Sequence, residues 1–171
     1  KKDGDRFLLE MATGTGKTTT SAAIIKMFLR LYKVNRVLFL VDRLELETQA
    51  KKEINDILSN DFETAIWKEN KDDWRRANIV ISTVQSFTKN NKYKRIFKPN
   101  SFDLVISDEA HRSLGASSRN VFEYFIGFKL GLTATPRDFL KSVDADDMSI
   151  TDPKQLERRL MLDTYSIFGC Y

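Results

Sequence analysis

The sequence predicts an α/β fold in which a parallel β-sheet is flanked by helices. Short apolar runs alternate along the chain with longer segments whose apolar residues recur at helical spacing, which is the pattern of a buried parallel sheet. In addition, a glycine-rich segment at residues 11–18, MATGTGKT, lies between the first apolar run and the first predicted helix. That is the strand–loop–helix context of a phosphate-binding loop.

Strands are predicted where short runs are most apolar, at residues 7–9, 36–42, 62–68, 79–82, 102–107 and 128–132. Between Arg36 and Asp42, the run at 36–42 is continuously apolar, as expected for a strand that is buried on both faces. Because apolar runs and helices alternate, these strands are expected to lie parallel in one sheet.

Helices are predicted at residues 19–32, 46–58 and 121–126, with a charged surface turn or helix at 71–76. The helix at 46–58 has its apolar residues at helical spacing and its Glu and Lys residues on the other face. Residues 140–152 are expected to be an acidic loop. Asp152 and Pro153 then predict the start of a further helix at 153–163, with Asp as the cap and Pro at the first position.

Composition describes one globular domain. The chain has 171 residues, of which 42% are hydrophobic and 30% charged, enough to bury about two-thirds of its unfolded surface. No apolar run approaches the ~20 residues of a membrane span, so no membrane partner is expected. The only cysteine, Cys170, excludes an internal disulfide and suits a cytoplasmic protein. Because the predicted first strand begins at residue 7, we expect the chain to be part of a longer protein.

The glycine-rich loop predicts a site for a nucleoside triphosphate with Mg²⁺. Gly14 and Gly16 allow backbone conformations that point successive N–H groups into one concavity, at the positive end of the following helix. Lys17 would reach the β- and γ-phosphates, and the Thr18 hydroxyl would bind Mg²⁺. Met11 stands where the general pattern has Gly, and the alternative is a simple turn. The predicted cofactor-binding residues are Thr13, Gly14, Thr15, Gly16, Lys17, Thr18 and Thr19.

A second candidate group, Asp108 and Glu109, follows the strand predicted at 102–107. Acidic residues at the carboxyl end of a parallel strand face the same crevice as the phosphate loop. Asp108 is expected to hold Mg²⁺ through its water shell. Glu109 is expected to accept a proton from the attacking water. The predicted catalytic residues are therefore Glu109, Lys17 and Asp108, and the alternative is a solvated loop.

A third group of polar residues lies near the proposed base, and its histidine is interpreted as a coupler rather than a proton carrier. His111 is the only histidine, two residues beyond the proposed base. Thr133 and Thr135 end the last predicted strand at the same edge of the sheet, within possible reach of His111. Pro136 stops that element, because proline cannot donate to a ladder.

In this order, ATGTGKT, DEAH and LTATP resemble motifs I, II and III of superfamily 2 helicases and translocases. Residues 39–43 resemble their motif Ia, and residues 82–87 resemble motif Ib. Longer strings are similar to the restriction (motor) subunit of type I restriction–modification enzymes, with which Met11 is also in keeping: LLEMATGTGKT, VLFLVDRLEL, DEAHRS, GLTATPRD and DTYSIFG.

This resemblance implies an ATP-driven translocase acting on double-stranded DNA, in a complex with modification and specificity subunits. Residues 1–137 would form a first RecA-like motor domain, and residues 138–171 would lead toward a second. The resemblance implies that His111, Thr133 and Thr135 couple the nucleotide state to the grip on DNA. It also implies contacts to the DNA backbone for Arg43, Thr83, Gln85 and Ser86, and such contacts position the protein but do not read sequence. The family's arginine finger and nuclease site are not matched by any part of the chain, so DNA cleavage is not assigned to it.

Some alternatives stay open. A helicase of another family that acts on RNA or DNA, or a non-catalytic clamp gated by nucleotide, would share several motifs. A small-molecule phosphotransferase would not need the segments at 82–87 and 132–136. The basic segment 89–98, KNNKYKRIFK, is expected to be a loop with Tyr93 and Phe97 interleaved. It is either a further nucleic-acid contact or a solvated run of charge. The net charge of +4 permits a polyanionic partner without requiring one.

Overall fold

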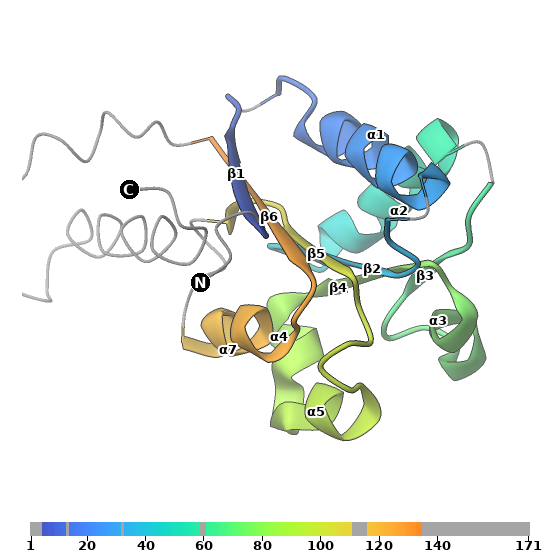
Figure 1. Ribbon diagram of the computed structural model, residues 1–171, viewed down its shortest axis with the longest axis vertical. Helices are drawn as coiled ribbons and strands as arrows, with labels where there is room; N and C mark the ends of the chain where they lie inside the picture. The colour runs from blue at the N-terminus through green and yellow to red at the C-terminus, as the bar shows by residue number, and fades with distance from the viewer. Residues whose placement is uncertain (1–4, 13, 32, 59–60, 111–115, 135–171) are drawn as a thin grey trace, which may run out of the picture.

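The computed structural model describes residues 5–12, 14–31, 33–58, 61–110 and 116–134. In these ranges, six strands form one sheet in the order β1-β6-β5-β2-β4-β3, and every neighbouring pair is parallel (Figure 1). The strands are β1 (Arg6–Glu10), β2 (Val37–Val41), β3 (Thr64–Ile66), β4 (Ile79–Thr83), β5 (Leu104–Ser107) and β6 (Phe128–Thr133). The predicted α/β fold is confirmed.

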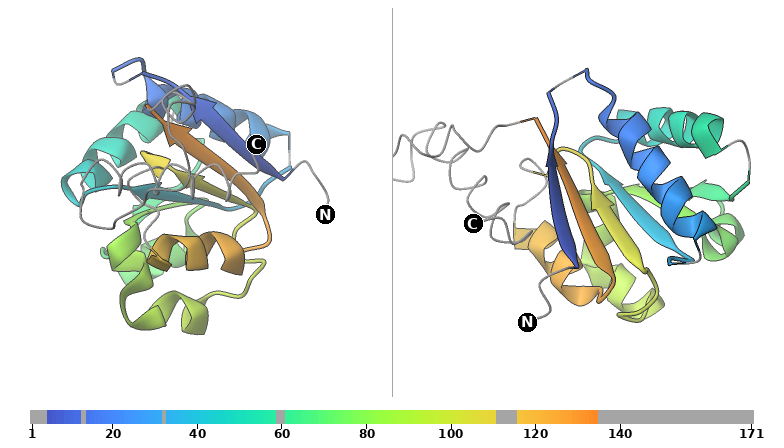
Figure 2. Two further views of the ribbon diagram at one scale, coloured as in Figure 1. Left: turned by 90° about the vertical axis from the view of Figure 1, so that its left-hand side faces the viewer. Right: turned by 45° about the horizontal axis from the view of Figure 1, so that its top comes forward.

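Helices cover both faces of the sheet, as the two views in Figure 2 show. They are α1 (Lys17–Arg30), α2 (Glu45–Leu58), α3 (Lys71–Arg76), α4 (Val84–Thr88), the 3₁₀ helix η1 (Lys89–Asn91), α5 (Lys92–Ile96) and α7 (Ala116–Tyr124). Each predicted helix in the described ranges is present. Helix α7 begins and ends earlier than the predicted 121–126. The loop and helix predicted at 140–163 lie outside the described residues.

The core consists of two layers of different composition. On the face covered by α1 and α2, aliphatic side chains predominate, among them Ile25, Ile54 and Ile106. The opposite face carries a dense aromatic cluster. Its members are Trp67, Trp74, Phe87, Tyr93, Phe97, Phe102, Phe122 and Phe125.

One sequence prediction is wrong. Residues 89–98 were expected to be a loop, but residues 92–96 form helix α5, preceded by a left-handed turn in which Asn90 and Asn91 have φ angles of 56° and 51°. Tyr93 and Phe97 are only 0% and 5% exposed, because residues four apart lie on the same face of a helix and here that face packs on the aromatic cluster. The density of lysine suggested a loop, whereas the burial of the two aromatic residues against the aromatic cluster favours the helix.

Because all six strands are parallel, their carboxyl ends meet at one edge of the sheet. The chain leaves β1 at an edge of the sheet, passes through α1 across β6 and β5, and enters β2. The start of α1 is thereby brought toward the end of β5. Within the described residues, no helix combines the length and the apolar character needed to cross a bilayer.

Candidate nucleotide-binding and hydrolysis site

The phosphate loop is a left-handed turn that leads directly into α1. Gly14 and Gly16 have φ angles of 78° and 85°, a region that favours glycine. Thr15 stabilises the turn, because its hydroxyl donates to the carbonyl oxygen of Ala12 at 2.7 Å. Gly16 is the N-cap of α1 and supplies no side chain to the first N–H groups of the helix. Those groups are therefore available to an anion.

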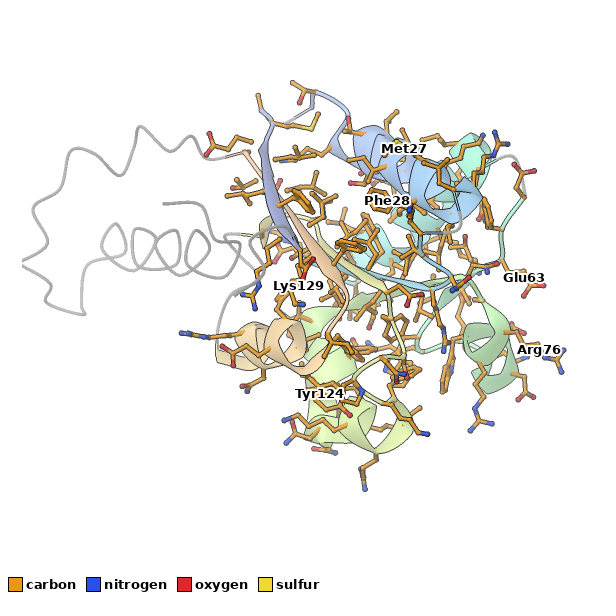
Figure 3. All side chains as sticks on the ribbon, in the orientation of Figure 1. Met27, Phe28, Glu63, Arg76, Tyr124 and Lys129 are labelled. Atoms are coloured by element: carbon orange, nitrogen blue, oxygen red, sulfur yellow. The ribbon has the colours of Figure 1, made fainter. Side chains whose placement is uncertain are left out.

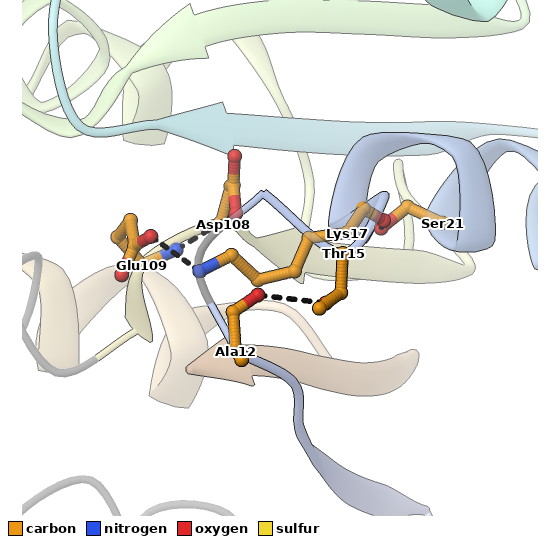
Figure 4. Close-up of polar contacts among 6 residues, drawn as sticks. All are labelled: Ala12, Thr15, Lys17, Ser21, Asp108 and Glu109. Carbon is orange, nitrogen blue, oxygen red and sulfur yellow. Dashed lines mark hydrogen bonds and ion pairs between the residues drawn. The ribbon is translucent and has the colours of Figure 1, made fainter. Parts of the chain in front are cut away.

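Lys17 crosses from the first turn of α1 to the end of β5. Its side chain is 8% exposed, and its Nζ lies 2.5 Å from Oε1 of Glu109 (Figure 4). The hydroxyl of Ser21 donates to the Lys17 carbonyl at 3.0 Å and stabilises this turn of the helix. The structure thus brings together two of the three residues predicted to be catalytic, although 92 positions separate them.

Asp108 and Glu109 form the turn that follows β5. The backbone N–H of Asp108 continues the sheet by donating to the Leu40 carbonyl at 2.8 Å. Glu109 has a positive φ of 50°, and its N–H donates to Oδ1 of Asp108 at 3.0 Å. This left-handed conformation is uncommon for a residue with a side chain, and strained backbone of this kind clusters at functional sites.

The environment of Asp108 suits a cation. Burial raises the pKa of Asp108, and the charge of Glu109 raises it further, against lowering by the Glu109 N–H and by Lys17. A nearby divalent cation would favour the ionised carboxylate. The side chain of Asp108 supplies carboxylate oxygens at the end of β5, beside the Lys17–Glu109 pair. Such a donor fits Mg²⁺, which binds one or two protein oxygens together with phosphates and water.

The predicted coupling residues are placed only in part. Thr133 ends β6 and is buried, and its carbonyl accepts a hydrogen bond from the N–H of Met11 at 2.8 Å. This bond joins the end of β6 to the start of the phosphate loop. His111, Thr135 and the predicted loop residue Thr13 lie outside the described residues.

The predicted nucleic-acid residues differ in exposure. Arg43 is 67% exposed and lies 3.5 Å from the Asp42 carboxylate, and Gln85 is also exposed. Thr83 is buried and caps α4, its hydroxyl accepting from the Ser86 N–H at 3.2 Å and contacting the Ser86 hydroxyl at 2.6 Å. Arg43 and Gln85 can therefore reach a ligand directly, whereas Thr83 shapes the turn.

Sequence reasoning missed Glu47. This residue of α2 is 6% exposed, and its Oε1 accepts the backbone N–H of Thr83 at 2.7 Å. It joins the segment after β2 to the start of α4, the two regions predicted to contact DNA. The helix was expected to keep its glutamates on the solvent face, but Glu47 precedes Ala50 and Ile54 by three and seven positions. That spacing places Glu47 on the apolar face of the helix. The same spacing is the feature of the sequence that could have predicted the burial of Glu47.

The chain matches the family model described as "Type III restriction enzyme, res subunit" over residues 1–138. It is 36% identical over 145 residues to the endonuclease subunit of the type I restriction enzyme EcoAI from Escherichia coli, a match that covers 78% of this chain and 17% of the relative. The corresponding EcoKI subunit of Escherichia coli K12 is 30% identical over 160 residues, covering 79% and 14%. The chain thus spans less than a fifth of the length of these relatives.

Solved structures agree with the fold. A fragment of a putative HsdR subunit of a type I restriction enzyme from Vibrio vulnificus is 26% identical, with a TM-score of 0.60, over 96% of this chain and 25% of that one. The UvsW helicase of bacteriophage T4, at 22% identity, has a TM-score of 0.66 over 91% and 51%. The resemblance drawn from the motifs is confirmed. The chain belongs to the ResIII family and is a helicase-like domain of the kind found in the endonuclease subunits of type I restriction enzymes.

Proposed function

We propose that this chain is the first motor domain of a type I restriction enzyme endonuclease subunit, and that it hydrolyses ATP to move along duplex DNA. The observation that carries the proposal is the contact between Lys17 and Glu109. It brings a cation suited to phosphate and a carboxylate suited to a water molecule to the same edge of the sheet, beside Asp108. Residues 1–137 would form this domain, and residues 138–171 would lead toward a second one.

The proposed roles follow from the donor and acceptor groups. The N–H groups at the start of α1 and the Lys17 ammonium would bind phosphate oxygens, so Lys17 would exchange Glu109 for the nucleotide. Glu109, once released, would accept a proton from the attacking water. Thr18 and Asp108 would hold Mg²⁺, whose charge would neutralise the phosphate oxygens.

Contact with DNA would come from the loops at the same edge of the sheet. Arg43 and Gln85 are exposed there, and such side chains commonly donate to phosphate oxygens. Glu47 would hold the two loops in register through Thr83. A type ISP restriction–modification enzyme, LlaGI, whose structure was solved with a DNA substrate mimic, shares the fold with a TM-score of 0.61 over 90% of this chain.

The test is the steady-state ATPase rate of the complete subunit with duplex DNA, single-stranded DNA or RNA, beside residues 1–171 alone. We expect duplex DNA to stimulate the complete subunit most. We expect the fragment to be slower by about 10³–10⁵-fold, because a partner domain would supply an arginine finger. Equal stimulation by RNA would overturn the duplex assignment. A fragment as fast as the complete subunit would overturn the two-domain interpretation.

A further inference from the structure

The positive charge of this protein is concentrated in one short segment. Residues 89–98 hold five of the 28 basic residues and none of the 24 acidic ones, so the rest of the chain, with 23 basic and 24 acidic residues, is close to neutral. All five basic side chains are exposed. They form what we call the basic face: Lys89, Lys92, Lys94, Arg95 and Lys98.

Within the part of the chain that the structure describes, the basic face lacks the carboxylate partners that other surface cations have. In other parts of the molecule, surface cations pair with acids, as Arg30 does with Asp61 and Arg119 with Glu123. Among the described residues, no member of the basic face forms an ion pair.

Two of its lysines lie instead beside aromatic rings. The ammonium of Lys92 is 5.9 Å from the centre of the Trp67 ring, and that of Lys94 is 5.8 Å from the centres of both Tyr93 and Tyr124. Such contacts leave the ammonium at the surface with its charge uncompensated.

Helix α5, which carries three of the five basic residues, is held in place by packing against buried aromatic side chains. Tyr93 is fully buried and stacks on Phe87 at 5.4 Å, and Phe97 packs edge-on against Phe102 at 4.9 Å. The Tyr124 hydroxyl, on α7, donates to the Phe97 carbonyl at 2.7 Å. The backbone of α5 is therefore ordered before any ligand binds, which lowers the entropic cost of binding.

The basic face also continues a predicted DNA contact. Helix α4 follows Thr83 and exposes Gln85, and α5 follows α4 in the chain after a left-handed kink at Asn90 and Asn91. Figure 1 shows α4, α5 and α7 together on one side of the sheet, and Figure 3 shows nitrogen-tipped side chains extending outward from this part of the molecule.

We propose that the basic face is a second contact for the phosphate backbone of duplex DNA, outside the loops that hold Arg43 and Gln85. Five like charges without an acidic neighbour in the segment match a phosphate backbone, which carries one charge per about 1.7 Å of duplex. A protein partner fits poorly, because protein interfaces are depleted in lysine and centred on apolar side chains. The exposed residues of 89–98 are all lysine, arginine or asparagine. The contact would be independent of sequence.

This inference rests on the proposed function, and the experiment separates the two. Duplex DNA binding by the complete subunit is measured by fluorescence anisotropy between 50 and 200 mM salt, for the wild type and two triple variants. One removes Lys92, Lys94 and Arg95 by substitution with Ala. The matched control replaces Lys33, Lys52 and Arg76 with Ala. These exposed cations lie in the turn after α1, in α2 and in α3, respectively, and none has an ion pair among the described residues.

Log K falls as log[salt] rises. For each phosphate that the Lys92/Lys94/Arg95 variant no longer neutralises, this fall should become less steep by about 0.9. Suppose that Lys92, Lys94 and Arg95 all bind phosphate. Between 50 and 200 mM salt, the affinity of the wild type should then fall about 40-fold more than the affinity of the variant that lacks these three side chains. The control variant should keep the wild-type slope. Circular dichroism melting of all three proteins checks that they are folded.

The two failures are distinguishable. If the wild type and both variants share one slope and one affinity, the basic face does not contact DNA, although the proposed function stands. An equal loss of affinity in the control variant would also overturn the inference, since it would reflect overall charge. If the wild type itself shows no salt-dependent binding to duplex DNA, the proposed function fails.

Discussion

Replacing Glu109 by Gln tests the proposed hydrolytic site most directly, because one change should move two measurements in opposite directions. The amide keeps the shape of the side chain but loses the charge that holds Lys17 and the ability to accept a proton. Hydrolysis should slow by about 10²–10⁴-fold, the usual contribution of a positioned base. ATP binding should become tighter, because Lys17 no longer has to leave an ion pair.

The size of the binding effect follows from the geometry of the pair. At the 2.5 Å separation of Lys17 Nζ and Glu109 Oε1, two unit charges attract by roughly 7 kcal/mol at an effective dielectric constant of about 20. Desolvation offsets most of this, leaving about 1.5–3 kcal/mol for a charged hydrogen bond against about 0.5–1.5 kcal/mol for a neutral one. The midpoints of these ranges differ by about 1.25 kcal/mol, which corresponds to roughly eightfold tighter binding.

The assay combines two measurements on the complete subunit, ATPase turnover with duplex DNA and calorimetric titration with a non-hydrolysable ATP analogue and Mg²⁺. Glu45→Gln is the control, since Glu45 is an exposed glutamate at the start of α2. Turnover within a few-fold of the wild type would refute Glu109 as the proton acceptor. Weaker nucleotide binding would refute the idea that Glu109 and the phosphates compete for Lys17.

Three further changes are predicted. Lys17→Ala should weaken ATP binding by about 1.5–3 kcal/mol, measured by the same titration, because the loop loses its charged donor. Burial raises the pKa of Glu47, so Glu47 holds its proton more strongly in the folded protein than in the unfolded chain. The free energy of unfolding should therefore fall as the pH rises from the pKa of Glu47 in the unfolded chain to its pKa in the folded protein. Glu47→Gln should remove that loss and keep the bond to Thr83, whereas Glu47→Ala should cost about 1–3 kcal/mol in urea unfolding. Gly127→Ala should destabilise by about 2–3 kcal/mol, because the added Cβ would lie 2.3 Å from the Asp103 carbonyl oxygen.

Each of these predictions has a result that would contradict it. Unchanged nucleotide affinity and turnover in Lys17→Ala would remove the basis for the phosphate loop. A parallel pH dependence of unfolding for Glu47→Gln and the wild type would show that Glu47 is not the group that titrates. Wild-type stability of Gly127→Ala would mean that the loop before β6 moves aside easily.

The sequence alone was enough to predict the layered α/β fold and the two halves of the candidate site. Apolar runs and helical spacing reflect local backbone geometry and burial, which the order of residue types records directly. The phosphate loop was readable for a similar reason, since left-handed turns at Gly14 and Gly16 depend on residues that lie next to each other.

Tertiary structure decided which distant groups meet. The sheet order β1-β6-β5 and the crossing of α1 over it bring Lys17 to Glu109, a contact that no local pattern contains. The same applies to Glu47, whose burial depends on the Thr83 N–H that it accepts. Segment 89–98 shows most clearly how little the residues of one segment say about its conformation. Its charge suggested a loop, but its conformation depends on an aromatic cluster assembled from other helices and loops. Burial energy is gained only when distant segments come together, so the sequence of one segment cannot determine it alone.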